Sequence, residues 1–275
     1  MSAVTLQLRA SYAFMERNFN LIKRYWSWEM VWLVYSTAES LSVSFIGLGM
    51  GVIDSSVQVN TGFLVLYLLI GNLVWRYLSQ IFYWITDLIS IERWEGTIEY
   101  TLMAPIHRLT HMAGQTFFAV LYSLVFTGVL LIATTLVFKL DLSNANLFGG
   151  LVMMLAGSFS FIGIGIMASV FPLLFPERGS QMTHVFIALL LLVSGVYYPI
   201  EVLPGLLRQI AVYSPATYVL VGTRQALLEG VPTGQLWPNI WPVLLMGAVL
   251  IPAGLWVFEV AERYAKRSGK LHRNG

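Results

Sequence analysis

Three glutamates follow the second long apolar stretch of the chain at the spacing of one helical face. Glu92, Glu95 and Glu99 recur at steps of three and four within IERWEGTIEYTLMAP. The same segment, a predicted helix over 91–104, carries an apolar face made of Ile91, Trp94, Ile98 and Leu102. An acidic ridge on a short amphipathic helix could dock into a basic groove of a partner protein. From the residues alone, a solvated helix whose carboxylates merely face water is the simpler interpretation.

Two charged residues lie deep inside apolar stretches, where an isolated ion is costly and is by default a functional hypothesis. Glu39 and Arg76 each lie about 15 residues from the outer end of a predicted span, which at ~1.5 Å per residue is roughly 21 to 23 Å of depth. Equal depth on adjacent antiparallel helices predicts that the two side chains form an ion pair. Whether the pair is a structural clamp or part of a moving pathway wall stays open.

The sequence offers little for catalysis or metal binding. His107 and His111 are four residues apart but have no third ligand nearby, so a metal site is not expected. The chain has no cysteine, which excludes disulfides and thiolate ligands. None of the four histidines lies near the centre of a predicted span, which argues against an intramembrane enzyme.

Aromatic residues within the apolar segments are weaker candidates. Tyr83, Tyr197 and Tyr198 could line a substrate path, although such residues face lipid or a neighbouring helix at least as often. No GxxxxGK[ST] phosphate loop is present, so the chain is not expected to bind a nucleotide or any other cofactor. The net charge of +2 gives no reason to expect a nucleic-acid partner.

These residues must be positioned by helices in lipid. Of the 275 residues, 57% are hydrophobic and only 11% are charged, against roughly 25% charged in an ordinary soluble domain. The apolar residues come in blocks of about 18 to 25, enough to cross a hydrocarbon core of roughly 30 Å. The sequence predicts an all-α integral membrane protein that forms a single domain over 1–275, with a six-span bundle over 28–260. The predicted spans are 28–53, 62–89, 115–138, 147–171, 182–198 and 241–260.

The segments outside the spans also have a pattern. Residues 1–26 repeat apolar side chains at steps of three and four, which predicts an amphipathic helix along the membrane surface. Segment 199–230 is too apolar for an exposed loop, yet Pro199, Pro204 and Pro215 interrupt it too often for a full crossing. Two short re-entrant helices that cap the outer side are therefore expected between spans five and six.

The distribution of basic residues predicts the orientation. With the N-terminus inside, twelve of the sixteen Lys and Arg residues lie on the cytoplasmic side, several of them in the basic tail 261–275. Lys139, Arg208 and Arg224 lie outside, and Arg76 lies within a span. Both termini are thus expected to be cytoplasmic, with the protein in the plasma or inner cell membrane.

Two ordered motifs make the chain similar to the permease subunits of type-2 ABC exporters, which have the type V fold. The first is E-R-x-x-G-T-x-E-x-x-x-x-x-P, present as Glu92, Arg93, Gly96, Thr97, Glu99 and Pro105. The second is S-G-x-x-x-P-x-x-x-L-P…P-x-x-Y…R-x-x-L, present as Ser194, Gly195, Pro199, Leu203, Pro204, Pro215, Tyr218, Arg224 and Leu227. Together with the six spans, the resemblance covers essentially the whole chain.

The resemblance implies that helix 91–104 is a coupling helix, with Glu92 to Tyr100 seated in a cleft of a separate ATPase subunit. It also implies two such ATPase subunits, which would bind ATP and Mg²⁺, and a second permease copy, either identical or a paralogue. The expected function is then ATP-driven export of an amphiphile such as a drug, a lipid or a lipid-linked glycan. The alternative is a transporter driven by an ion gradient, with Glu39 and Asp87 as its proton or cation sites.

Overall fold

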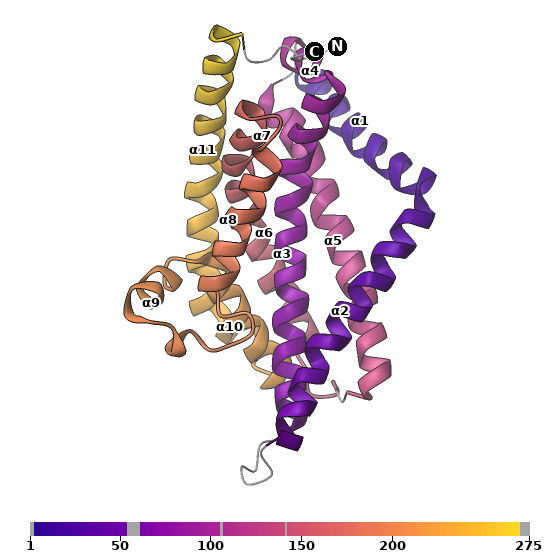
Figure 1. Cartoon of the computed structure of the whole chain (residues 1–275), viewed down its shortest axis with the longest axis vertical. Helices are drawn as coiled ribbons and strands as arrows, with labels where there is room; N and C mark the ends of the chain where they lie inside the picture. Colours follow the sequence, from indigo (N-terminus) through magenta and orange to yellow (C-terminus); the bar gives the residue numbers. More distant parts are fainter. Residues whose placement is uncertain (1–2, 54–60, 105–106, 141, 270–275) are drawn as a thin grey trace.

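The computed structural model describes residues 3–53, 61–104, 107–140 and 142–269, and every regular element in these ranges is a helix. The elements, drawn in Figure 1, are α1 (Ala3–Arg24), α2 (Trp26–Ile53), α3 (Thr61–Glu95), α4 (Ile98–Met103), α5 (Arg108–Phe138), α6 (Leu147–Ala168), α7 (Val170–Leu174), α8 (Gly179–Val193), η1 (Ile200–Val202), α9 (Gly205–Ala211), α10 (Pro215–Leu228), η2 (Thr233–Leu236) and α11 (Trp237–Arg267).

Five segments are long and apolar enough to cross a membrane. They are α2, α3, α5, α6 continued by α7, and α11 preceded by η2. The fifth predicted span corresponds to α8, which has only 15 residues, about 22 Å of helix against a core of roughly 30 Å. The protein is therefore a multi-pass, all-helical membrane protein, and the predicted total of six spans stays a prediction.

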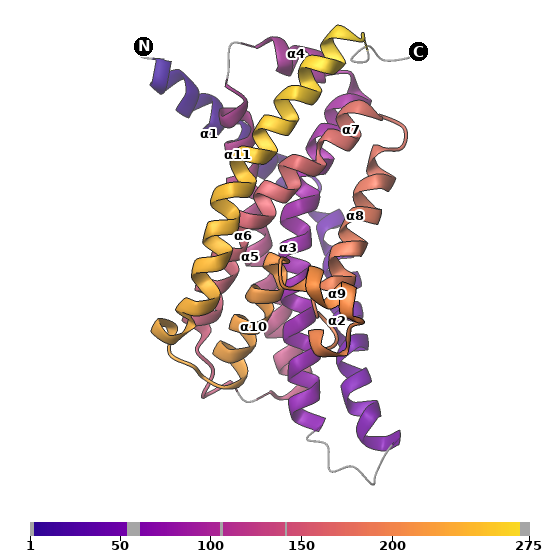
Figure 2. The same ribbon diagram turned by 90° about the vertical axis from the view of Figure 1, so that its left-hand side faces the viewer.

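The chain returns across the bundle in two pieces rather than in one helix. Figure 2 shows α8 descending from the end where α4 lies, α9 turning aside, and α10 continuing toward the opposite end. Pro199 and Pro204 immediately precede η1 and α9, and Pro215 is the first residue of α10. Each proline therefore lies just before or at the first residue of a helix, where its missing N–H costs little. The segment predicted to hold two re-entrant helices contains η1, α9 and α10, and their re-entry into the membrane stays a prediction.

Helix α3 is the centre of the bundle. It packs against α2, α5, α6, α8 and α10, and Figure 1 shows it between them. Its buried side chains include Tyr77 and Phe82, which are among the largest fully buried residues. Because α4 and α7 contact α3 as well, seven helices adjoin it, and a displacement of its end must change the packing of these neighbours.

The contact between α6 and α11 depends on glycines, whose lack of a side chain lets the two helices approach closely. A Cβ atom on Gly163 would lie 2.6 Å from backbone and side-chain atoms of Leu250, and one on Gly254 would lie 2.7 Å from the carbonyl oxygen of Gly163. Small residues let two helix backbones approach closely in lipid, where hydrophobic attraction between helices is absent. The α6–α11 pair is consequently a tight unit beside α3.

Helix α1 uses one face against α5 and leaves another exposed. Asn18 donates a hydrogen bond to the side chain of Gln115, and the Phe14 ring lies 4.8 Å from the ring of His111. Tyr12 and Phe19, which belong to the apolar face predicted to lie on the membrane, are exposed. The orientation of α1 is thus compatible with an apolar face turned toward lipid.

The helices end at other residues than the predicted segments in three places. Helix α3 continues beyond the predicted end of the second span, residue 89, to Glu95. The predicted single helix 91–104 was wrong, because it is divided at Gly96 into the end of α3 and a separate α4. Residues 261–267 of the predicted basic tail are helical, since α11 runs to Arg267. Pro105 and residues 270–275 of the tail lie outside the described residues.

Candidate functional sites

The division at Gly96 has a clear local cause. Gly96 has a φ of +72°, in the left-handed region that residues with a Cβ avoid. Its N–H donates to the carbonyl of Arg93 at 3.3 Å, and the N–H of Thr97 donates to the carbonyl of Glu92 at 2.9 Å. This is the Schellman pattern that ends a helix. Since the turn redirects the chain, residues before and after it no longer share one helical face.

The predicted acidic ridge is therefore wrong in part. Glu92 is only 2% exposed, and its Oε1 lies 3.1 Å from Nε2 of His111 on α5. Arg93 is buried as well and interacts electrostatically with Glu99. Glu92 cannot touch a partner; its role is to fix the end of α3 against α5. His111, predicted only as a poor metal ligand, is the residue that pairs with it.

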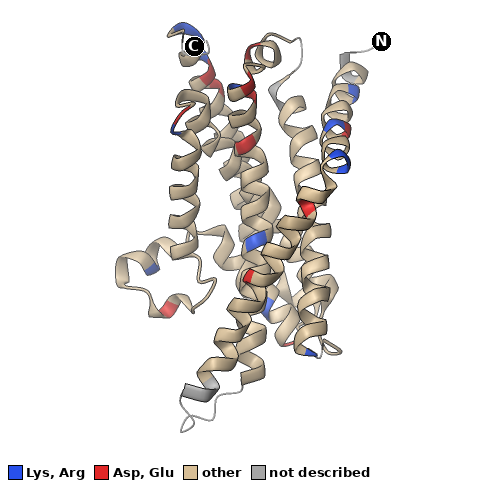
Figure 3. Cartoon of the chain, turned by 45° about the vertical axis from the view of Figure 1, so that its right-hand side comes forward, with Lys and Arg blue, Asp and Glu red and all other residues tan. Residues whose placement is uncertain are grey.

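The surface left at this end is aromatic and apolar. Trp94, Tyr100 and Met103 are 75%, 78% and 81% exposed, while Ile98 and Leu102 from the predicted apolar face are buried. Glu95 is exposed beside them. We call Trp94, Glu95, Tyr100 and Met103 the α3–α4 tip. Figure 3 shows that charged residues gather toward this end of the molecule and are sparse along the middle.

Glu39 and Arg76 lie together in the middle of the bundle. Nη1 of Arg76 is 3.0 Å from Oε2 of Glu39, and the guanidinium also lies 5.4 Å from the centre of the Phe126 ring. The pair is not enclosed, since the side chains of Arg76 and Glu39 are 20% and 42% exposed. One side of this ion pair is open toward whatever surrounds the chain.

A second arginine, Arg224, lies within the segment predicted as re-entrant. It is on α10 and is only 9% exposed, and its predicted place on the outer side stays a prediction. It donates to the carbonyl oxygens of Gly195 at 3.0 Å and Val196 at 2.6 Å, and its guanidinium lies 3.5 Å from the centre of the Tyr67 ring. We call this arrangement the Arg224 clamp.

The clamp requires the glycine at position 71. A Cβ atom there would lie 2.2 Å from the carbonyl oxygen of Val196 and 2.6 Å from Nη2 of Arg224. The clamp therefore ties α10 and the end of α8 to α3 at a point where only glycine fits. Two signals in the sequence pointed to Arg224, its place in the second motif and its position within the apolar run YVLVGTRQALL, but neither identifies the groups that it contacts.

The three tyrosines suggested as path residues do not share a cavity among the described residues. Tyr197 donates to Oδ1 of Asn72 at 3.1 Å, and Tyr198 donates to the carbonyl of Leu192 at 2.6 Å. The ring of Tyr83 lies 5.0 Å from that of His184, close to Asp87. Asn72 also donates to Ser40 on α2 at 2.9 Å, so Tyr197 links the segment after α8 to both α3 and α2.

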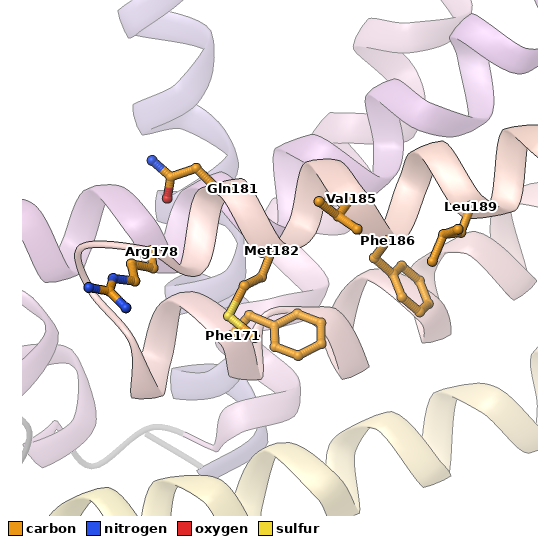
Figure 4. Close-up of a pocket in the computed structure, with 7 residues that line it drawn as sticks. All are labelled: Phe171, Arg178, Gln181, Met182, Val185, Phe186 and Leu189. Atoms are coloured by element: carbon orange, nitrogen blue, oxygen red, sulfur yellow. The ribbon is translucent and has the colours of Figure 1, made fainter.

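An open, largely apolar pocket lies on α8 and the neighbouring α7, and we call it the α8 pocket. It has a volume of about 620 Å³ and is lined by Phe171, Arg178, Gln181, Met182, Val185, Phe186 and Leu189. Figure 4 shows Met182, Phe186 and Leu189 following one another along α8, with Phe171 of α7 beside them and Arg178 at the α7–α8 turn. Within the described ranges, no three His, Asp or Glu side chains are grouped so that they could hold a metal ion.

Comparisons with known proteins agree with this architecture. A family model described as "ABC-2 family transporter protein" matches residues 30–256. The linearmycin resistance permease protein LnrN of Bacillus subtilis is 24% identical over 165 residues, which are 59% of this chain. The aligned region spans 42% of that relative's length.

Proposed function

Since the chain belongs to the ABC-2 family of transporter permeases, we propose that it is the membrane subunit of an ATP-driven exporter. ATP and Mg²⁺ are bound by two separate ABC ATPase subunits, because this sequence has no phosphate loop. The end that carries α4, the start of α1 and the end of α11 faces the cytoplasm, as the excess of basic residues favours. The protein lies in the plasma or inner cell membrane.

The α3–α4 tip is the observation that carries this proposal. Trp94 and Tyr100 are large, exposed and rigidly held at the end of the longest and most central helix. Tryptophan and tyrosine are the residue types that most often dominate the binding energy of protein interfaces. The ATPase groove then has apolar pockets for Trp94 and Tyr100 and a basic rim for Glu95.

Motion at the tip has a direct route into the membrane. Helix α3 is continuous for 35 residues from the tip to Thr61 and includes Arg76 and Asn72. Closure of the ATPases pushes on the tip and tilts α3, and α2 and α5 move with it because they pack against it. A path between two permease copies opens or closes as a result.

A second permease copy is supported by the open ion pair. An ion pair with one side facing hydrocarbon is costly, so intramembrane charges face protein or a water-filled cavity. The exposed side of Glu39 is accordingly covered by a second copy or by the path between the copies. The cargo is amphiphilic, because the surfaces that α2 and α8 expose are predominantly apolar. A drug, a lipid or a lipid-linked glycan fits this description.

The ion-gradient alternative is weakened by one contact. Its proposed cation site at Glu39 is occupied by Arg76 at 3.0 Å, so binding a second cation there would require this pair to open. Transport that persists without ATPase activity and collapses with the ion gradient would favour the alternative.

The proposal is tested by co-purification of the permease with an ABC ATPase from the same cells. The double variant Trp94→Ala/Tyr100→Ala is expected to lose the ATPase and the transport, because hot-spot truncations cost about 2 kcal/mol or more each. The matched control is Trp256→Ala/Tyr213→Ala, which removes equally exposed residues from α11 and from the turn before α10. Equal ATPase recovery with both double variants would contradict docking at the tip.

A further inference from the structure

The α8 pocket has its polar and apolar parts at separate ends. Met182, Val185, Phe186 and Leu189 extend along about 10 Å of α8, and Phe171 closes the side formed by α7. Arg178 lies at the α7–α8 turn, at the start of this apolar row. A ligand that fills the pocket must therefore be apolar along its length and polar at one end.

The polar end is a cation without a counter-charge. Arg178 is exposed, and no acidic side chain in the described part of the chain lies within ion-pair distance of it. The side-chain amide N–H groups of Gln181 are not available to the ligand, because they are best placed to donate to the carbonyl oxygens of Arg178 at 3.0 Å and Glu177 at 3.1 Å. Arginine presents a fork of N–H donors that matches phosphate and carboxylate groups.

The depth of the pocket agrees with that polarity. The α7–α8 turn lies at the same end of the bundle as α4 (Figure 2), and Arg178 is the N-cap of α8 while Leu189 lies farther along this helix. With this end at the cytoplasmic interface, as proposed above, Arg178 is near the headgroups and Leu189 is deeper in the hydrocarbon region. An amphiphile of the cytoplasmic leaflet has the same arrangement, with its headgroup at the interface and its tail inward.

We propose that the α8 pocket binds an amphiphile with an anionic headgroup, with the headgroup on Arg178 and the first part of the tail along Met182 to Leu189. The volume of about 620 Å³ falls within the range of small-molecule sites. In the transporter, this pocket is the site where cargo enters from the bilayer. That assignment rests on the proposed function, and it restricts the cargo class to anionic amphiphiles.

The test measures equilibrium binding of radiolabelled oleyl phosphate to the purified full-length chain in neutral detergent, without ATPase or ATP. Oleyl alcohol and oleylamine have the same tail with a neutral and a cationic headgroup, so as competitors they isolate the contribution of the headgroup charge. Oleyl phosphate is expected to bind at least about tenfold more tightly than either competitor. Because no ATPase takes part, failure of this binding leaves the proposed docking and export untouched.

Variants at two positions locate the site. Arg178→Gln is expected to weaken oleyl phosphate binding about tenfold while leaving the binding of the alcohol unchanged, and Arg178→Lys is expected to restore part of the loss. The matched control is Arg208→Gln, another exposed arginine, on α9. Val185→Trp fills the pocket and should abolish binding of all three probes, whereas Leu206→Trp, on the exposed surface of α9, should not.

Several results overturn the proposal. Equal affinity for the three probes removes the role of charge, and equal loss in Arg178→Gln and Arg208→Gln shows binding to surface charge in general. Binding that survives Val185→Trp places the ligand elsewhere. A change in oligomeric state with Val185→Trp, measured by size-exclusion chromatography with light scattering, shows that a second copy covers the pocket.

Discussion

Two arginines lie among the apolar helices of this protein, and their surroundings differ. Arg224 is enclosed: two backbone carbonyls accept its hydrogen bonds, and the Tyr67 ring covers its guanidinium. Arg76 is bound by a single carboxylate, from Glu39, and that carboxylate is itself 42% exposed on its side chain. The acceptors of the first charge all lie within the chain, although its buried Nε has none, whereas the second charge has an open side.

This difference distinguishes an arginine that stabilises the fold, Arg224, from one whose surroundings leave room for a functional role, Arg76. The carbonyls that Arg224 binds, Gly195 and Val196, follow the end of α8, where helical partners are missing. Arg224 therefore completes the fold of a broken crossing. Arg76 and Glu39 lie on α3 and α2 with one side unsatisfied by this chain, so they respond to a second copy or to water.

The largest expected effect follows from breaking the clamp. Arg224→Leu leaves the carbonyls of Gly195 and Val196 without donors, at about 1–3 kcal/mol for each buried group. The variant should unfold at a clearly lower temperature in detergent, measured by fluorescence-detected size-exclusion after heating. Arg208→Leu, at an exposed position on α9, should unfold like the unmodified protein. Equal unfolding temperatures for the two variants would show that the clamp is not structural.

Gly71→Ala tests the same clamp without removing its charge. The new Cβ would lie 2.2 Å from the carbonyl oxygen of Val196, so the segment after α8 or Arg224 must shift. Overpacking of this kind costs about 1–3 kcal/mol. The control is Gly49→Ala in α2, where nothing lies within 4 Å of the new atom. A variant at position 71 as stable as the control would mean that the contact relaxes freely.

The Glu39–Arg76 pair is expected to contribute little to the free energy of unfolding. Its position is expected to matter more for the access of water to residue 39. Because Glu39 is two-fifths exposed, exchanging Glu39 and Arg76 should recover only about 1 kcal/mol of the loss seen in the single neutral variants. The absence of native cysteine permits a sharper measurement. Glu39→Cys should react with a membrane-impermeant thiol reagent in the assembled transporter, and the reaction should change when ATP is added. Val249→Cys, exposed on the apolar surface of α11, should stay unreactive.

The reactivity of position 39 also decides between the two interpretations of the Glu39–Arg76 pair, a structural clamp or part of a moving pathway wall. If Glu39→Cys is as unreactive as Val249→Cys in every nucleotide state, the open side is sealed by protein. The pair is then a clamp at a subunit interface and not part of a water-filled wall.

Much of this fold could be read from apolar blocks, because lipid forces a helix wherever about 20 apolar residues occur together. Depth along two such blocks was also enough to bring Glu39 and Arg76 together. The burial of Glu92 could not be predicted from such local patterns. Its spacing from Glu95 and Glu99 predicts one acidic face, but a left-handed Gly96 ends the helix between them, and burial against His111 depends on how α5 packs.

The partners of Arg224 could not be predicted for a related reason. The sequence placed Arg224 in a short re-entrant helix on the outer side, and a count of basic residues says nothing about which groups such a charge contacts. Only the three-dimensional return of the chain places α10 beside Gly71 and supplies backbone acceptors. Local patterns predict elements well, whereas the partners of a buried charge come from distant segments.

The smallest expected effect concerns the hydrogen bonds that connect the Arg224 clamp with the Glu39–Arg76 pair. Tyr197 follows the carbonyls held by Arg224, and its hydroxyl donates at 3.1 Å to Asn72, which in turn donates to Ser40, the neighbour of Glu39. Tyr197→Phe removes only that hydroxyl and should cost about 0.5–1.5 kcal/mol. Tyr213→Phe, at an exposed tyrosine, is the control and should cost nothing. If the link transmits movement, Tyr197→Phe in the Glu39→Cys background abolishes the ATP-dependent change in labelling while the clamp keeps the protein folded. Unchanged labelling would show that the two arginines act independently, and that the path to Glu39 runs through α3 alone.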